Sequence, residues 1–296
     1  MTRYIALCKI IELGSFTKAA QALGYTQAAI SQMISSLEKE FSFKLLVRTR
    51  TGITLTSEGA TLYPLIQKSV YVNQDLADRV NEIKGLSSGE VRIGTFTSIA
   101  QHWLPKLIKE FNEIYPNIKF ILHQGDNITI PEWIKSNKVD FGFVSYKETP
   151  DLKLDEVDED LYYAVFPKKH RLACLEKIPL KELENEQLLM IEEGTPNNAI
   201  QHFNELGLYP EVKFRIQDDF TILSMVEENF GVSILPSLVL KRTSYEYSAV
   251  PTEPSIHRKI YLAYQNIGLM SMAAQKFMEF VKKRLPNVIE DIKKTL

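Results

Sequence analysis

The sequence predicts an α/β protein with an all-α N-terminal domain, and three observations support this prediction. Residues 15–56 contain two short amphipathic segments, a tight turn between them and a basic hairpin. Residues 57–84 carry a broken apolar stripe at helical spacing. From residue 90 onward, strand-like and helix-like segments alternate, which favours a parallel sheet with helical crossovers.

Three helices are predicted in the N-terminal domain, the first over residues 3–13. The second covers residues 16–23, because Ser15 is a good N-cap and Gly24 can take the left-handed conformation that ends a helix. Thr26 then caps a third helix over residues 27–41. Its expected buried face is Ala29 or Ile30 with Ile34, Leu37 and Phe41, and Met33 lies beside them. This order of elements is typical of a helix-turn-helix.

The other face of the third helix carries small or amide-bearing side chains, which can approach a DNA groove and contact base edges or phosphates. The predicted DNA contacts of this face are Gln27, Ala28, Ser31, Gln32, Ser35 and Lys39. The hairpin that follows reads as a wing, with Arg48, Arg50 and Thr51 near its tip for phosphate or minor-groove contact. From periodicity alone, an ordinary three-helix bundle with a surface hairpin remains open as the alternative.

The charge distribution favours the DNA-binding interpretation. Residues 1–56 contain 7 Lys+Arg and 3 acids, a net charge of +4, whereas the rest of the chain has 28 basic and 34 acidic residues, a net charge of −6. A basic N-terminal domain on an acidic body is what a protein that contacts the phosphate backbone through one end would show.

A long helix is predicted from the cap at Thr56 to about residue 84. A small winged domain cannot cover the whole apolar stripe of such a helix, so a second copy of the same helix is its natural partner. The alternative is packing against the C-terminal part of the same chain. Pro64 predicts a bend in the first turns, and residues 85–89 read as a flexible hinge.

The C-terminal part is predicted to form two similar α/β lobes joined by two chain crossings, with a ligand cleft where strand ends and helix starts converge. The expected strands are 90–94, 119–123, 139–145, 161–166, 188–191, 212–216, 232–235 and 260–264. The expected helices are 99–114, 131–136, 197–206, 221–229 and 271–285.

Candidate ligand-binding residues are those that follow these strands. They are Thr97, Ser98, Gln124, Gly125, Ser145, Glu193, Gly194, Thr195, Asp219, Phe220 and Thr221. Taken alone, each of them more often serves a cap or a turn, and only together do they predict a cleft site. Acids at 192, 193, 218 and 219 would favour a neutral or cationic ligand if they face the cleft, whereas pointing outward they are a solvated surface.

The N-terminal residues closely resemble the DNA-binding domain of LysR-type transcriptional regulators. The matching positions are Phe16, Ala19, Ala20, Leu23, Ser31, Leu37, Glu38, Leu45, Arg48, Gly52, Leu55, Thr56 and Gly59. Two positions depart from the family pattern: Ala28 replaces a usual proline, and Phe41-Ser42 replaces a usual Leu-Gly. The second departure removes a left-handed glycine, so the helix is expected to end differently.

The resemblance extends, more loosely, to about residue 285. It rests on Gly94, Leu104-Pro105, Tyr115-Pro116, residues 139–142 (VDFG), residues 170–172 (HRL), Pro179-Leu180, Gly207 and residues 231–236 (GVSILP). It implies a two-lobed periplasmic-binding-protein-like (type 2) effector domain, whose inducer-binding loops correspond to the candidate residues above. It also implies linker helices that pair antiparallel in a dimer.

The implied organisation has a winged helix-turn-helix domain at 1–58, a linker helix and hinge at 59–89, and a regulatory domain at 90–296. Lobe I is expected at 90–162 and 266–296, and lobe II at 163–265. The implied function is ligand-responsive regulation of a bacterial promoter. The implied partners are double-stranded DNA, a small-molecule effector, further copies in a homodimer or homotetramer, and RNA polymerase.

Other classes of protein find little support in the sequence. No apolar stretch is long enough for a membrane span and no signal peptide is recognisable, so a cytoplasmic protein is expected. Two cysteines and five scattered histidines predict no metal site and no cofactor. The common nucleotide-binding, hydrolase and metalloprotease motifs are absent, which argues against an enzyme. A small-molecule-binding α/β protein without a DNA-regulatory role remains the alternative.

Overall fold

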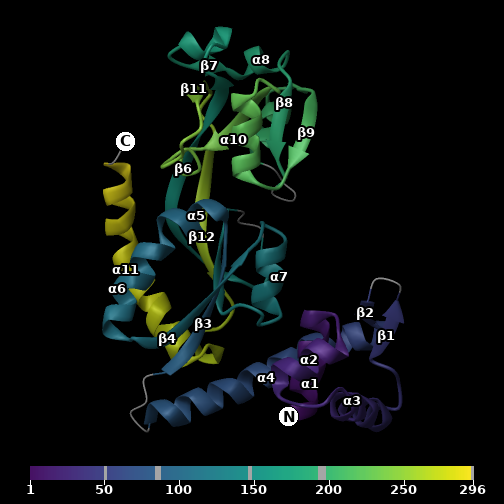
Figure 1. Ribbon diagram of the computed structural model, residues 1–296. Helices are drawn as coiled ribbons and strands as arrows, with labels where there is room; N and C mark the ends of the chain where they lie inside the picture. Colours follow the sequence, from purple (N-terminus) through teal and green to yellow (C-terminus); the bar gives the residue numbers. More distant parts are fainter. Residues whose placement is uncertain (50–51, 84–87, 146–148, 193–197, 295–296) are drawn as a thin grey trace.

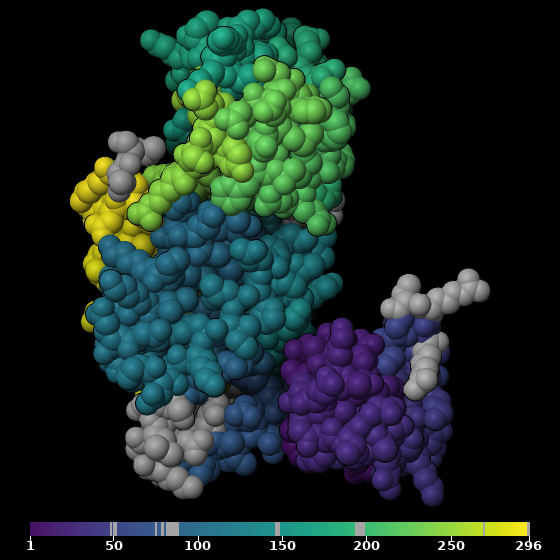
Figure 2. Space-filling view, viewed as in Figure 1, coloured from purple at the N-terminus to yellow at the C-terminus, as the bar shows by residue number. Residues whose placement is uncertain are grey.

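The computed structural model describes residues 1–49, 52–83, 88–145, 149–192 and 198–294. Figure 1 shows a small helical head, a long helix that leads away from it, and an elongated two-lobed body. In the space-filling view of Figure 2, lobe II (green) is stacked on lobe I (blue), and the head (purple) projects from the side of the body.

The head contains the three predicted helices and the hairpin. They are α1 (Thr2–Leu13), α2 (Phe16–Leu23), α3 (Gln27–Phe41), β1 (Leu46–Thr49) and β2 (Gly52–Leu55). The predicted caps are in place, because the Ser15 hydroxyl accepts the Lys18 amide at 3.3 Å and the Thr26 hydroxyl accepts the Ala29 amide at 3.2 Å. The core of the head includes Ile30, whereas Ala29 lies at its edge.

The end of α3 differs from the expectation. Ser42 adopts a left-handed conformation with φ 64°, so the helix ends as it would with the glycine usual in the family. A side chain at such a position costs roughly 1–2 kcal/mol relative to ordinary right-handed backbone. The tertiary position of the next segment, rather than the local preference of serine, therefore determines this helix end.

The linker helix α4 runs from Ser57 to Ile83 and contains Pro64. Leu62 and Ile66 pack on the core of the head, which explains why the apolar stripe begins there. Further along, a set of apolar side chains is 41–63% exposed. These residues, called the linker stripe below, are Leu65, Val72, Leu76 and Val80.

The body is built on one continuous sheet in the order β4-β3-β5-β12-β6-β10-β8-β9, with β11 beside β6 and β7 beside β11. The strands are β3 (Ser88–Thr95), β4 (Asn117–Gln124), β5 (Phe141–Val144), β6 (Lys153–Pro167), β7 (Ile178–Pro179), β8 (Leu188–Ile191), β9 (Val212–Ile216), β10 (Val232–Pro236), β11 (Tyr247–Glu253) and β12 (His257–Tyr264). The helices are α5 (Thr97–His102), α6 (Leu104–Ile114), α7 (Thr129–Lys135), α8 (Leu180–Leu183), α9 (Asn198–Glu205), α10 (Asp219–Glu227) and α11 (Met272–Lys293), with short 3-10 turns at Arg171–Cys174 and Ile267–Leu269.

The sheet is mixed rather than purely parallel. The strand pairs β3–β4, β3–β5, β8–β9 and β8–β10 are parallel, as predicted, whereas β6 runs antiparallel to β10, β11 and β12. Strand β6 is also much longer than the predicted 161–166. Its first half was missed because five of the eight residues at 153–160 are acidic, a composition typical of a loop. Strand β11 was not predicted at all.

The helix around Trp103 and the terminal helix also differ from prediction. The single helix expected over 99–114 is broken at Trp103 into α5 and α6, because Pro105 has no amide to continue the helical ladder. The terminal helix α11 continues past Pro286 to Lys293 instead of stopping at 285.

The second crossing between the lobes lies earlier in the chain than expected. Strand β12 pairs with β5 through residues 261–263 and with the first half of β6, so it belongs to lobe I and not to a lobe II ending at 265. Strand β6 passes from lobe I to lobe II near Leu161, where its pairing changes from β12 to β10. Both lobes keep their own apolar core on either side of this pair of crossing strands.

None of the described helices is long and apolar enough to cross a membrane. Within the described ranges, no group of three or more histidine, cysteine or acidic side chains gathers as a metal site would require. The two cysteines are free: Cys8 is half-buried in the head and Cys174 is exposed in lobe II.

Candidate nucleic-acid interface and effector cleft

The predicted DNA-facing side of α3 is open to solvent. Gln27, Ala28, Gln32, Ser35 and Lys39 are exposed, while Ser31 is half-buried. The opposite side of the helix is held in the head core by Ile30, Ile34 and Leu37. The side chain of Arg48 lies outside what the structure describes, as do Arg50 and Thr51.

A buried carboxylate fixes the hairpin to α3. Glu38 is 7% exposed and accepts hydrogen bonds from the Leu45 amide (2.9 Å), the Leu46 amide (3.3 Å) and the Lys44 ammonium (2.7 Å). Burial alone would raise the pKa of Glu38, but these hydrogen bonds outweigh it and hold the pKa below its ordinary value. The hairpin is therefore positioned relative to the exposed face of α3.

A close backbone approach completes this junction. A Cβ atom on Gly59 would lie 2.3 Å from the Leu45 carbonyl oxygen, so only glycine fits between α4 and the start of the hairpin. Thr56 spans the same junction, because its hydroxyl donates to the Lys44 carbonyl (2.7 Å) and accepts from the Gly59 amide (3.0 Å). Three family-matching positions, 38, 56 and 59, thus serve the geometry of the head.

A cleft of about 450 Å³ lies between the two lobes. Lobe I lines it with Phe96, Thr97, Ser98, Gln124, Gly125, Asp126, Thr129, Trp133 and Arg258. Lobe II lines it with Ile191, Glu192, Gln217, Asp218 and Asp219. Apart from Trp133 of α7 and Arg258 of β12, these residues come from the ends of β3, β4, β8 and β9 and the starts of α5, α7 and α10, as the predicted topology requires.

The structure brings five of the candidate residues into this lining: Thr97, Ser98, Gln124, Gly125 and Asp219. Three others serve the scaffold and are not among the lining residues. Ser145 is buried against Asn127, whose amide donates to the Ser145 hydroxyl at 3.0 Å. Phe220 stacks on Tyr245, and Thr221 donates to the Asp218 cap of its own helix. Glu193, Gly194 and Thr195 lie outside the described residues.

Several lining residues were missed from sequence. Arg258 carries no local signal, because only the pairing of β12 with β6 brings it to the floor of the cleft. Asp126 and Thr129 had a readable signal: an Asp three residues before a Thr is a helix-start pattern, and the Asp126 carboxylate accepts the Thr129 amide at 2.7 Å. Gly125 leaves the space against which the Trp133 ring lies, since a Cβ there would be 2.7 Å from that ring.

A buried ion pair forms the floor of the cleft. The Arg258 guanidinium lies 3.0 Å from the Asp160 carboxylate and 3.3 Å from the Ser98 hydroxyl, and the Arg258 and Asp160 side chains are 3% and 5% exposed. Asp160 also accepts the hydroxyl of Ser237 at 2.6 Å. Because Ser237 belongs to lobe II and Arg258 to lobe I, this pair connects the lobes at the crossing strands.

Asp219, unlike Asp160, lacks a paired partner among the residues that the structure describes. Its carboxylate accepts no hydrogen bond and forms no ion pair within the described part of the chain, although it lines the cleft. Burial, reinforced by the neighbouring charge of Asp218, raises the pKa of Asp219 to about 6, and Arg258 only partly offsets this. Perturbed carboxyl groups in clefts are frequent at functional sites.

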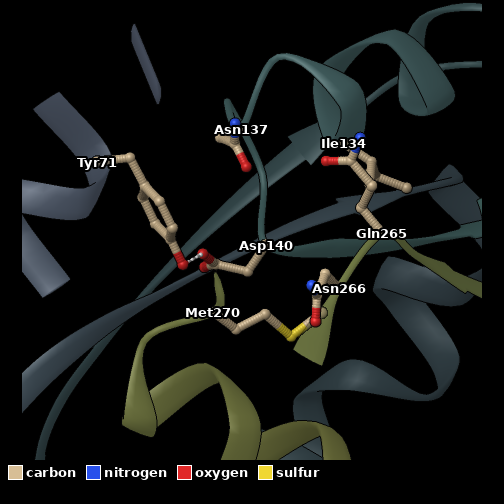
Figure 3. Close-up of a pocket in the computed structure, with 7 residues that line it drawn as sticks. All are labelled: Tyr71, Ile134, Asn137, Asp140, Gln265, Asn266 and Met270. Atoms are coloured by element: carbon tan, nitrogen blue, oxygen red, sulfur yellow. Dashed lines mark hydrogen bonds between the residues drawn. The ribbon is translucent and has the colours of Figure 1, made fainter. Parts of the chain in front are cut away.

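A second polar cluster joins the linker helix to lobe I (Figure 3). The Tyr71 hydroxyl donates to the Asp140 carboxylate at 2.8 Å and accepts the Ser271 amide at 2.8 Å. Arg92 lies 4.5 Å from the centroid of the Tyr71 ring and bonds Asp140 through its guanidinium at 3.0 Å and its backbone amide at 2.6 Å. The cavity that borders Tyr71 and Asp140 has a volume of only about 10 Å³, so little space is left beside the cluster.

The pattern of the LysR substrate binding domain matches residues 84–286, and that of the bacterial regulatory helix-turn-helix of the lysR family matches residues 1–60. An uncharacterized HTH-type transcriptional regulator of Bacillus subtilis, YvbU, is 31% identical over 286 residues, covering 96% of this chain and 98% of the relative. The activator CmpR of a Synechocystis species is 28% identical over 278 residues, covering 92% and 91%.

Solved structures agree on the fold. A full-length OxyR variant from Pseudomonas aeruginosa has a TM-score of 0.69 at 19% identity, covering 98% of this chain and 92% of that one. Full-length CbnR in complex with its target DNA also has a TM-score of 0.69, at 18% identity, covering 95% and 98%. The chain belongs to the LysR family and is a ligand-responsive, DNA-binding regulator of transcription.

Proposed function

We propose that an effector bound between the lobes changes their relative angle and that α4 transmits this change to the DNA-binding heads. The cleft of about 450 Å³, lined from both lobes, is the observation that carries the proposal. The proposed units are a winged head at 1–58, a linker and hinge at 59–89 and a regulatory domain at 90–296. A regulator of this kind acts on a promoter in the cytoplasm.

Helix α7 and the Tyr71 cluster support a route from the cleft to the linker. Thr129 and Trp133 of α7 line the cleft, whereas Asn137, just beyond its end, accepts the Arg92 guanidinium through its carbonyl at 3.1 Å. Arg92 and Asp140 in turn hold Tyr71 of α4. Because α7 packs directly on Gly94 and Gly142, where a Cβ would lie within 3.0 Å of Ile130, the helix cannot tilt without moving the strands beneath it.

The linker stripe supports self-association as the basis of paired heads. Its four side chains lie on one side of a 27-residue helix and are exposed in the single chain. A second copy of the same helix offers a matching apolar stripe, which favours a homodimer, and contacts between regulatory domains would extend it to a homotetramer. RNA polymerase is the further partner expected of a regulator bound at a promoter.

In the proposed DNA interface, Gln32 reads a base edge and Arg48 contacts a phosphate, with Gln27, Ala28, Ser31, Ser35, Lys39, Arg50 and Thr51 around them. The exposed amide of Gln32 supports its role, since Gln can bond adenine through two contacts in the major groove. The positive charge of the head supports phosphate contacts.

A gel-shift titration on the promoter region beside the gene tests the proposal, with random DNA of equal length as competitor. We expect Gln32→Ala to lose about 1–3 kcal/mol on the specific site only, and Arg48→Ala to weaken both DNAs with a salt slope lower by about 1. The exposed Gln201→Ala of lobe II serves as the matched control. The proposal fails if the full chain gives no salt-sensitive, sequence-specific shift.

A further inference from the structure

The charges around the cleft indicate the chemical class of its effector, an inference that rests on the proposed effector role of this cleft. The described lining contains four carboxylates and one guanidinium. The carboxylates are Asp126, Glu192, Asp218 and Asp219, and the guanidinium belongs to Arg258.

Arg258 is poorly placed to receive an anionic effector. Its guanidinium is 3.0 Å from Asp160 in a pair that is almost fully buried, and it also bonds Ser98. An incoming carboxylate would have to compete with Asp160, and a displaced Asp160 would be left buried without its counter-charge. Such an uncompensated buried charge strongly destabilises the fold.

Two of the three helix starts that line the cleft, those of α7 and α10, are occupied by carboxylates of the chain, whereas the start of α5 has no side-chain cap. Backbone amides at the start of a helix are the usual group that binds an anion. At α10 the Asp218 carboxylate accepts the Thr221 amide at 2.7 Å, and at α7 the Asp126 carboxylate accepts the amides of Ile128 (2.9 Å) and Thr129 (2.7 Å). At α7 and α10 the chain therefore places its own carboxylates where an anionic ligand would bind.

Two carboxylates remain available to a ligand. Asp219 has no hydrogen-bond or ion-pair partner within the described residues. Glu192 forms a long ion pair of 3.9 Å with Arg215, and its side chain is 41% exposed. Both line the cleft from lobe II, and the rings of Phe96 and Trp133 line it from lobe I. The Lys138 ammonium already lies 4.2 Å from the centroid of the Trp133 ring. The two rings therefore offer apolar surface to a carbon skeleton, and the carboxylates offer the site for a positive charge.

We propose that the effector is a small organic cation, an amine or guanidine, whose charged group binds Asp219 and Glu192 while its carbon skeleton lies against Phe96 and Trp133. A ligand held in this way contacts both lobes at once. It supplies a counter-charge to Asp219 and so favours closure of lobe II on lobe I.

Matched probes that differ mainly in charge test the proposal on the full-length chain at constant ionic strength. One set is 1,4-diaminobutane, 1,4-butanediol and succinate, and the other is benzylamine, benzyl alcohol and benzoate. We expect the amines to raise the melting temperature and to bind in calorimetric titrations, and the alcohols and carboxylates to do neither. Asp219→Asn should weaken amine binding by about 10- to 100-fold, the loss of one charged hydrogen bond.

Two further variants make the result decisive. Glu205→Gln removes the same charge from an exposed position of lobe II and should leave amine binding unchanged. Glu192→Gln provides a second cleft variant with an accessible side chain. The proposal is overturned if no amine binds, if succinate or benzoate binds more tightly than its amine, or if both cleft variants bind amines like the parent chain. None of these outcomes changes the promoter shift of the unliganded chain, which tests the proposed function separately.

Discussion

Asp140 and Asp219 are two carboxylates of the body with opposite surroundings. Asp140, with a side chain 1% exposed, accepts hydrogen bonds from Tyr71, from the Arg92 amide and from the Arg92 guanidinium. Asp219 lines an open cleft and accepts none from the described residues. The contrast teaches which polar site holds the molecule together and which one is left for a ligand.

Two guanidinium groups of lobe I resemble Asp140 in this respect, because both already have a charged partner. Arg92 and Arg258 each pair with a buried aspartate at 3.0 Å, so neither is a vacant positive group. Polar groups with a complete set of partners rigidify a structure, whereas incompletely satisfied ones are costly unless a ligand completes them. Four substitutions sharpen or break this comparison.

The largest change in the free energy of unfolding is expected for the cluster of Tyr71, Arg92 and Asp140. Asp140→Asn removes the charge that Arg92 and Tyr71 share, and breaking a buried pair of this kind costs about 3–5 kcal/mol. Denaturant unfolding of the full chain measures the change. Asp151→Asn, whose side chain is 79% exposed, is the control and should shift stability by less than about 0.5 kcal/mol. Equal effects of the two variants would refute a structural role for the cluster.

A smaller loss of stability is expected for Tyr71→Phe. The variant keeps the ring under Arg92 but leaves the buried Ser271 amide without its acceptor, at a cost of about 1–3 kcal/mol. Hydrogen exchange should show faster opening around residue 71 of α4 than in the parent. Tyr209→Phe, at an exposed tyrosine of lobe II, should be neutral. Unchanged exchange in α4 would mean that the hydroxyl does not fasten the linker.

A substitution in the cleft, Asp219→Asn, is expected to raise the stability of the fold instead of lowering it. Because the folded chain raises the pKa of Asp219 from its ordinary 3.8 to about 6, the proton on Asp219 stabilises the fold fully below pH 3.8, and this contribution is lost as pH rises through 6. Asp219→Asn removes the cost of the buried charge and should stabilise the chain by about 1–2 kcal/mol at pH 7.5. Unfolding at pH 3.5 should show almost no gain, and a gain of equal size at both pH values would contradict this account.

The smallest effect is expected in the head, away from both carboxylates. Ser42→Gly relieves the left-handed conformation at the end of α3 and should stabilise the head by about 0.5–1 kcal/mol. Ser35→Gly, in the middle of the same helix, is the control and should destabilise it by a similar amount. Thermal unfolding of the two variants tests the difference, which disappears if Ser42 carries no backbone strain.

Much of the fold followed from local patterns. The limits of α2 and α3 and the caps Ser15 and Thr26 agree with prediction, because a helix and its cap involve residues only three or four positions apart. The predictions failed where the structure depends on contacts between residues far apart in the sequence. The acid-rich first half of β6 becomes a strand only because β12 pairs with it, and Ser42 takes a conformation that its own preference disfavours.

The sequence by itself determined the helices of the head, the exposed amide-rich face of α3, the long linker and the alternation that makes two lobes. Only the tertiary structure decided which side chains share the cleft and how the linker is fastened. The decisive contacts join Tyr71 to Asp140, Arg258 to Asp160 and Arg258 to Ser98, over separations of 69, 98 and 160 residues. No local pattern encodes such pairs, because they depend on strand register and on the burial that leaves each charge in need of a partner.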